Sequence, residues 1–147
     1  MRRFLLLMLV AAAVAAVPVA QAGKPVIMPA PALNFTDDTT CGFDVVVHYV
    51  ANAETMKIFD SGKILITGPL SATYSANGKT TAVLNISGPV EINGATALAR
   101  GIGAGTIQMP DGTLMMVHAA GVVEFSSAGA TLVHGHILLD ICAALAP

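Results

Sequence analysis

Two histidines separated by one residue, His134 and His136, are the residues whose type and spacing most directly suggest chemistry. On a β-strand, residues two apart project from the same face, so both imidazoles would be offered to one ion. Asp140 follows on that face, and His118 is placed to approach from a neighbouring strand. Such a set suits zinc, copper or iron. The other interpretation is that polar residues alternate outward on a terminal strand whose opposite face is apolar.

The spacing His-x-His-x-x-x-Asp over His134–Asp140 resembles the first motif of the cupin family. The resemblance implies a metal-dependent enzyme that uses His134 and His136. A cupin carries a second motif with another histidine further along the chain, and none follows Asp140 in this sequence. We therefore expect no cofactor, and keep a zinc or copper site as the alternative.

No other pattern points to catalysis. The sequence has no Gly-x-Ser-x-Gly elbow for a nucleophilic serine. Charged residues make up 11% of the 147 residues, against about 25% in an average soluble domain. Seven Lys and Arg against nine Asp and Glu leave no basic excess to neutralise phosphates, which argues against nucleic acid as a partner. We expect no catalytic residue.

The first 22 residues have the three parts of a secretory signal peptide. Arg2 and Arg3 precede an apolar run over Phe4–Val17, and Ala20-Gln21-Ala22 ends the segment. The apolar run is shorter than the roughly 20 residues that span a membrane. We expect cleavage between Ala22 and Gly23 and a secreted, extracytoplasmic mature chain without a transmembrane anchor.

Two cysteines, Cys41 and Cys142, stand near the two ends of the mature chain. An even number of cysteines in an exported protein favours a disulfide bond. The alternative is two buried free thiols that pack as small apolar residues.

Short runs of β-branched and apolar residues, separated by turn residues, dominate from Cys41 onward. Asn77-Gly78 and Asn93-Gly94 supply the positive φ angles of tight hairpins. This pattern predicts a single all-β domain over residues 41–147, an antiparallel β-barrel or β-sandwich of about eight to ten short strands. Residues 23–40 are expected to be an extended lead-in. Pairing of Phe43–Val50 with Ala130–Cys142 would close such a barrel.

Glycines mark further features of the fold. Gly68-Pro69 and Gly88-Pro89 each predict a bend or sheet corner, because proline donates no hydrogen bond to a ladder. Gly101, Gly103 and Gly105 occupy alternate positions on one strand face, which suits a tight bend or a close approach of two backbones.

Cys41-Gly42-Phe43 and Asn85-Ile86-Ser87-Gly88-Pro89 resemble motifs of small exported β-rich proteins of Gram-positive actinobacteria. The resemblance implies bacterial export and a compact β-domain, and it implies no catalytic residue. Three functions remain open: a non-enzymatic β-domain that binds a small apolar ligand or a cell-surface component, the metal-dependent enzyme, and a structural envelope protein.

Overall fold

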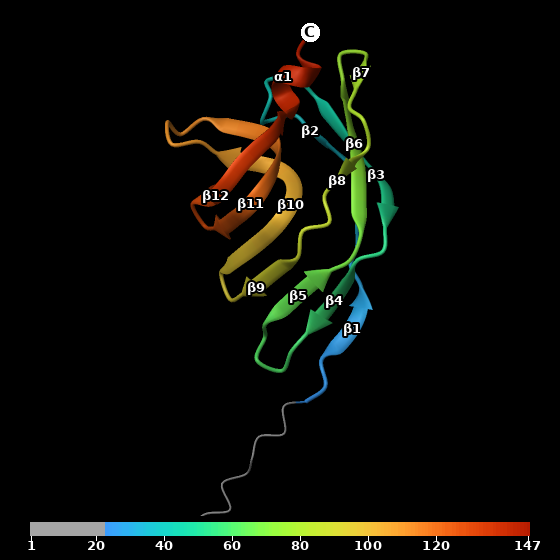
Figure 1. Cartoon of the computed structure of the whole chain (residues 1–147), viewed down its shortest axis with the longest axis vertical. Coiled ribbons are helices and arrows are strands. Elements are labelled where there is room, and N and C mark those ends of the chain that lie inside the picture. The colour runs from blue at the N-terminus through green and yellow to red at the C-terminus, as the bar shows by residue number, and fades with distance from the viewer. Residues whose placement is uncertain (1–22) are drawn as a thin grey trace, which may run out of the picture.

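The computed structural model describes residues 23–147, so the predicted signal peptide lies outside the described residues. The described chain is all-β, as the sequence predicts, with twelve strands and one short helix (Figure 1). None of its helices has the length and apolar character needed to cross a membrane. In chain order the elements are β1 (Val26–Pro29), β2 (Phe35–Asp37), β3 (Val45–Asn52), β4 (Thr55–Ile58), β5 (Ile64–Thr67), β6 (Leu70–Ala76), β7 (Lys79–Thr80), β8 (Leu84–Asn85), β9 (Val90–Asn93), β10 (Thr96–Gln108), β11 (Leu114–Ser126), β12 (Gly129–Asp140) and α1 (Ile141–Leu145).

The strands form two antiparallel sheets. The order of the first is β1-β4-β5-β9-β10-β11-β12, and that of the second is β2-β3-β6-β7, with β8 also paired to β6. Within residues 23–147, each of these sheets keeps two free edges and does not close on itself. The expected pairing of Phe43–Val50 with Ala130–Cys142 is therefore wrong. The corresponding strands, β3 and β12, lie in different sheets because each pairs with a strand nearer in sequence.

Residues 23–40, expected as an extended lead-in, contribute a strand to each sheet. β1 pairs with β4 at the edge of the seven-stranded sheet, and β2 pairs with β3 in the five-stranded sheet. Their side chains are largely exposed, so the pairing depends on backbone hydrogen bonds and leaves no apolar periodicity in the sequence.

Each Gly-Pro pair lies where the chain passes from one sheet to the other. Gly68-Pro69 joins β5 to β6, and Gly88-Pro89 lies between β8 and β9. A methyl group on Gly68 would lie 2.5 Å from the carbonyl oxygen of Ala53, in the segment that makes the crossing from β3 to β4. The prediction of sheet corners at these pairs is confirmed.

The main core lies between the five-stranded sheet, the end of β12 and α1. Val45, Val47 and Tyr74 of the five-stranded sheet pack with Ile141 and Leu145 of α1. The predicted disulfide is present beside this core, with the Cα atoms of Cys41 and Cys142 5.2 Å apart. It joins the segment before β3 to α1, and so fastens the five-stranded sheet to the element that follows β12.

The strands β10, β11 and β12 bend where three glycines stand side by side. Gly101 is paired with Gly121, and Gly121 with Gly135. A methyl group on Gly121 would lie 2.0 Å from the carbonyl oxygen of His134, and one on Gly135 would lie 2.1 Å from that of Ala120. Only glycine allows backbones to approach this closely. Figure 1 shows β10 curving strongly, so that the two halves of this part of the sheet face each other.

Removing the disulfide is expected to destabilise the fold strongly. The cysteines are 101 positions apart, and a loop of that size gives about 4.7 kcal/mol in the chain-entropy model. The double variant Cys41→Ser/Cys142→Ser should therefore unfold at much lower denaturant concentration than the oxidised protein. Equal urea midpoints for the oxidised wild type and this variant would contradict the assignment.

Gly121→Ala is expected to lower the free energy of unfolding by about 3 kcal/mol or more, because its methyl group meets backbone atoms and its φ is +149°. Gly103→Ala is the matched control on β10. Its methyl group would meet nothing within 4 Å, and the change should be within about 1 kcal/mol of neutral. Chemical denaturation of both variants tests the bend, and equal effects would argue against it.

Candidate functional site

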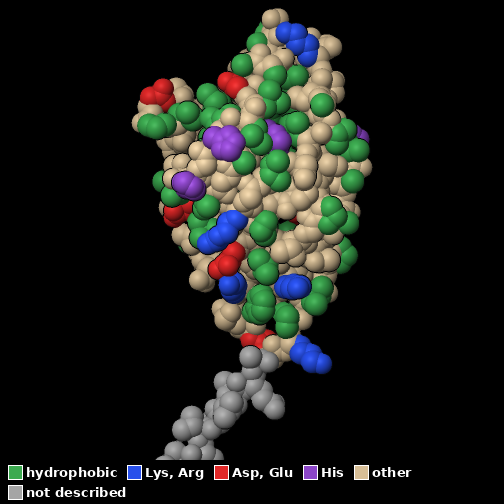
Figure 2. Space-filling view, in the orientation of Figure 1, with side chains coloured by type: hydrophobic (Ala, Val, Ile, Leu, Met, Phe, Trp, Pro, Cys, Tyr) green, Lys and Arg blue, Asp and Glu red, His purple; other side chains and the backbone are tan. Residues whose placement is uncertain are grey.

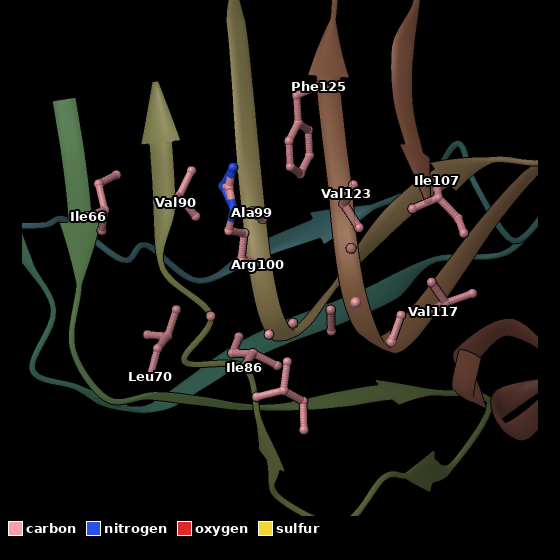
Figure 3. Close-up of a pocket in the computed structure, with 18 of the residues that line it drawn as sticks. Ile66, Leu70, Ile86, Val90, Ala99, Arg100, Ile107, Val117, Val123 and Phe125 are labelled. Atoms are coloured by element: carbon pink, nitrogen blue, oxygen red, sulfur yellow. The ribbon is translucent and has the colours of Figure 1, made fainter. Parts of the chain in front are cut away.

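The bend in the seven-stranded sheet holds an apolar cavity of about 220 Å³. Figure 3 shows Ile66, Val90, Val123 and Phe125 along the strands on one side of the cavity, and Ile107 on the side to which the strands return. Phe125 is 41% exposed, which leaves the cavity open to solvent.

The floor of the cavity lacks side chains. Gly103 is paired with Ala119 and Gly105 with Val117, so both glycines share the face of these two inward-pointing residues. A methyl group on either glycine would meet no atom within 4 Å. The empty space therefore exists because β10 carries hydrogen atoms there instead of side chains.

The walls come from the two halves of the bent strands. Val117 and Ala119 lie before Gly121 on β11 and Val123 lies after it, yet all three belong to one apolar cluster with Ile107 and Leu132. Because strand residues alternate in direction, these odd-numbered positions of β10 and β11 lie on one face. That face is turned inward by the bend, which buries Ile107, Val117 and Ala119.

Polar side chains reach the cavity from the side of the five-stranded sheet. Tyr49 of β3 and Glu54, in the crossing from β3 to β4, both line it. Burial raises the pKa of the Glu54 carboxyl. Burial, and to a lesser degree the charge of Glu54, raises the pKa of the Tyr49 phenol.

A second hollow of about 600 Å³ opens beside the turn between β10 and β11. Ile107 lines both this hollow and the first cavity, and Met109, Leu132 and Ile137 line the hollow alone. Its wall at Ile137 lies on β12, which is a free edge of the sheet. One wall of this hollow is therefore exposed to solvent, because β12 is an edge strand with exposed side chains.

The four residues singled out as metal ligands have separate surroundings. His118 is 8% exposed, and its Nε2 lies 2.9 Å from the carbonyl oxygen of Asn85, which links β11 to β8. Asp140 is the N-cap of α1 and accepts a hydrogen bond from the amide of Ala143 at 2.9 Å. His134 and His136 are exposed on β12, opposite Val122 and Ala120.

The register does place three of these histidines on one face. His134, His136 and His118 all lie on the face opposite to the cavity, as their strand spacing suggests. In the part of the chain that the structure describes, no three His, Cys, Asp or Glu side chains are grouped so that they could hold a metal ion. Histidine side chains are visible at separate places on the molecular surface in Figure 2.

Sequence reasoning identified one part of the cavity. The alternate glycines Gly101, Gly103 and Gly105 marked the bend, but the same pattern gave no reason to expect a cavity there. The missing information was the pairing: Gly101 lies opposite Gly121, and Gly121 lies opposite Gly135, which are distant in sequence.

Comparison with protein-family models, with curated proteins and with solved structures finds no match. No activity, ligand or partner therefore carries over to this chain from a relative. The evidence on function is the shape and chemistry of the cavity.

Glu54→Gln is expected to stabilise the protein at pH 7. The raised pKa of Glu54 means that ionising this carboxyl opposes folding above its folded-state pKa. At about pH 3, well below the unfolded-state pKa of about 4.3, the carboxyl is protonated in the folded and unfolded states alike, so the difference should vanish there. Urea unfolding of wild type and variant at both pH values checks this, and an equal difference at the two would contradict it.

Proposed function

We propose that this chain is an exported, non-enzymatic β-domain that binds a small apolar molecule in the bend of its seven-stranded sheet. In this proposal the two sheets act as a β-sandwich whose longer sheet folds over to make the binding cavity. Residues 1–22 direct export and are removed, as in the exported actinobacterial proteins that the sequence resembles.

The single observation that carries the proposal is the apolar cavity with a glycine floor. Large side chains at Gly103 and Gly105 would fill it, and the φ angles of these two glycines are outside the left-handed region. A cavity of about 150 Å³ lined by apolar side chains holds benzene. A cavity of about 220 Å³ therefore suits a molecule somewhat larger than benzene.

The lining favours an apolar ligand over a polar one. Ile66, Val90, Val123 and Phe125 offer no hydrogen bonds, so a polar group placed against them would lose its hydrogen bonds to water. The polar side chains of the lining, among them Tyr49, Glu54 and Arg100, are the minority. The first cavity is preferred to the hollow beside the β10–β11 turn because its walls include the buried Val117 and Ala119.

The disulfide supports the exported state. Disulfide bonds persist in oxidising compartments outside the cytoplasm and are rare within it. In the described chain both cysteines are joined, and there is no free thiol to protect.

Gly103→Val is expected to weaken binding of n-hexanol by about tenfold or more, because the valine side chain occupies the floor of the cavity. Its melting temperature should not fall, since valine suits a strand and fills empty space. Val46→Leu, on the exposed face of β3, is the control and should bind n-hexanol like wild type. Isothermal titration calorimetry measures the affinity of both variants for n-hexanol. Unchanged affinity in Gly103→Val, or no binding by wild type, would refute the proposal.

A further inference from the structure

Two rows of apolar side chains lead away from the cavity across the seven-stranded sheet. In the antiparallel register, directly opposed residues point to the same face. Every member of both rows is apolar. The first row is Met28, Met56, Ile66, Val90, Ala99, Val123 and Leu132, and the second is Val26, Ile58, Ile64, Ile92, Ala97, Phe125 and Ala130.

The opposite face of the same strands carries charged side chains. Between the two apolar rows, on the other face, Lys57 is paired with Leu65, and Leu65 with Glu91. Glu91 also forms an ion pair with Lys63 at 2.9 Å. One face of the sheet thus alternates charge with apolar residues, whereas the face that leads into the cavity carries no polar side chain in these rows.

The row members on β1 are exposed, and those on β4, β5 and β9 are half-buried. These row members belong to neither buried cluster. Val26 is 58% exposed and Met28 is 41% exposed. The closest contacts of these four strands with other strands are those with their neighbours in the same sheet. What distinguishes this face is that its apolar side chains continue from those that line the cavity, such as Ile66 and Val90.

The dimensions fit one hydrocarbon chain. From β10 to β4 the rows cross three strand spacings, about 14 Å in all. One lipid chain spans half of a hydrocarbon core that is about 30 Å thick, or about 15 Å. The two rows stand about 7 Å apart, since their members are two residues apart along each strand. A single chain can lie between them.

We infer that the ligand is an amphiphile with a single long alkyl chain, whose end enters the cavity and whose remaining length lies along the two apolar rows. The inference rests on the proposed function and extends it from a small apolar molecule to a chain. A second copy of this protein docked face to face would leave the cavity empty, because a sheet face is too broad to enter it. An alkyl chain fills both the cavity and the space between the two apolar rows.

Chain-length dependence of binding tests this inference. Wild type is titrated with n-hexanol, n-octanol, n-decanol and n-dodecanol. Because each buried methylene raises affinity about fourfold, affinity should keep rising to n-dodecanol, beyond the length that the cavity alone can hold. Ile64→Gln, in the second row and outside the cavity lining, should remove most of the gain beyond n-hexanol and leave n-hexanol binding unchanged.

Leu65→Gln is the matched control, because it places the same polar group one residue away on the opposite face. It should bind all four alcohols like wild type. If Ile64→Gln does not fold, Ile58→Gln takes its place, since Ile58 is the half-buried partner of Ile64 in the second row on β4. Thermal unfolding confirms that each variant is folded.

The outcomes separate this inference from the proposed function. If wild type binds n-hexanol but gains nothing with longer alcohols, the small-ligand cavity stands and the alkyl-chain inference fails. If wild type binds none of the alcohols, both fail. If wild type is dimeric in sedimentation and Ile64→Gln makes it monomeric, a second copy covers the rows and the inference is overturned.

Discussion

The close approach of backbones at Gly121 and Gly135 is the constraint on which the site depends. No side chain fits between these strands, since a methyl group at either position would lie about 2 Å from a carbonyl oxygen. The resulting bend turns one face of β10 and β11 back onto itself, so that Val117 and Val123 of the same strand pack in one cluster. A flat sheet of the same sequence would expose these residues and enclose no cavity.

The second sheet and the disulfide hold the bent sheet in place. The five-stranded sheet supplies Val45, Val47 and Tyr74 to the main core, and α1 covers the end of that core. Asp140 caps α1, and His118 of β11 reaches the carbonyl oxygen of Asn85 on β8, so His118 links the two sheets. In the structure both residues, which the sequence suggests as metal ligands, make structural hydrogen bonds.

Local residue chemistry predicted the fold class but not the site. Asn77-Gly78 forms its turn with both residues at positive φ, the Gly-Pro pairs lie at sheet crossings, and the cysteines are joined. The turn and the sheet crossings are decided by adjacent residues, and the disulfide follows from there being two cysteines in the sequence. The cavity depends instead on which residues lie opposite each other on neighbouring strands, such as Gly103 and Ala119. This register cannot be predicted from any single segment of the sequence.

Methyl NMR of the protein with n-hexanol tests the central claim most directly, that the inward-turned face of the bend is a ligand site. The account predicts intermolecular contacts from the alcohol to the methyl groups of Ile107, Val117 and Val123, with the signal of the outward-facing Val46 unchanged. Contacts confined to surface residues such as Val46, or none at all, would contradict it.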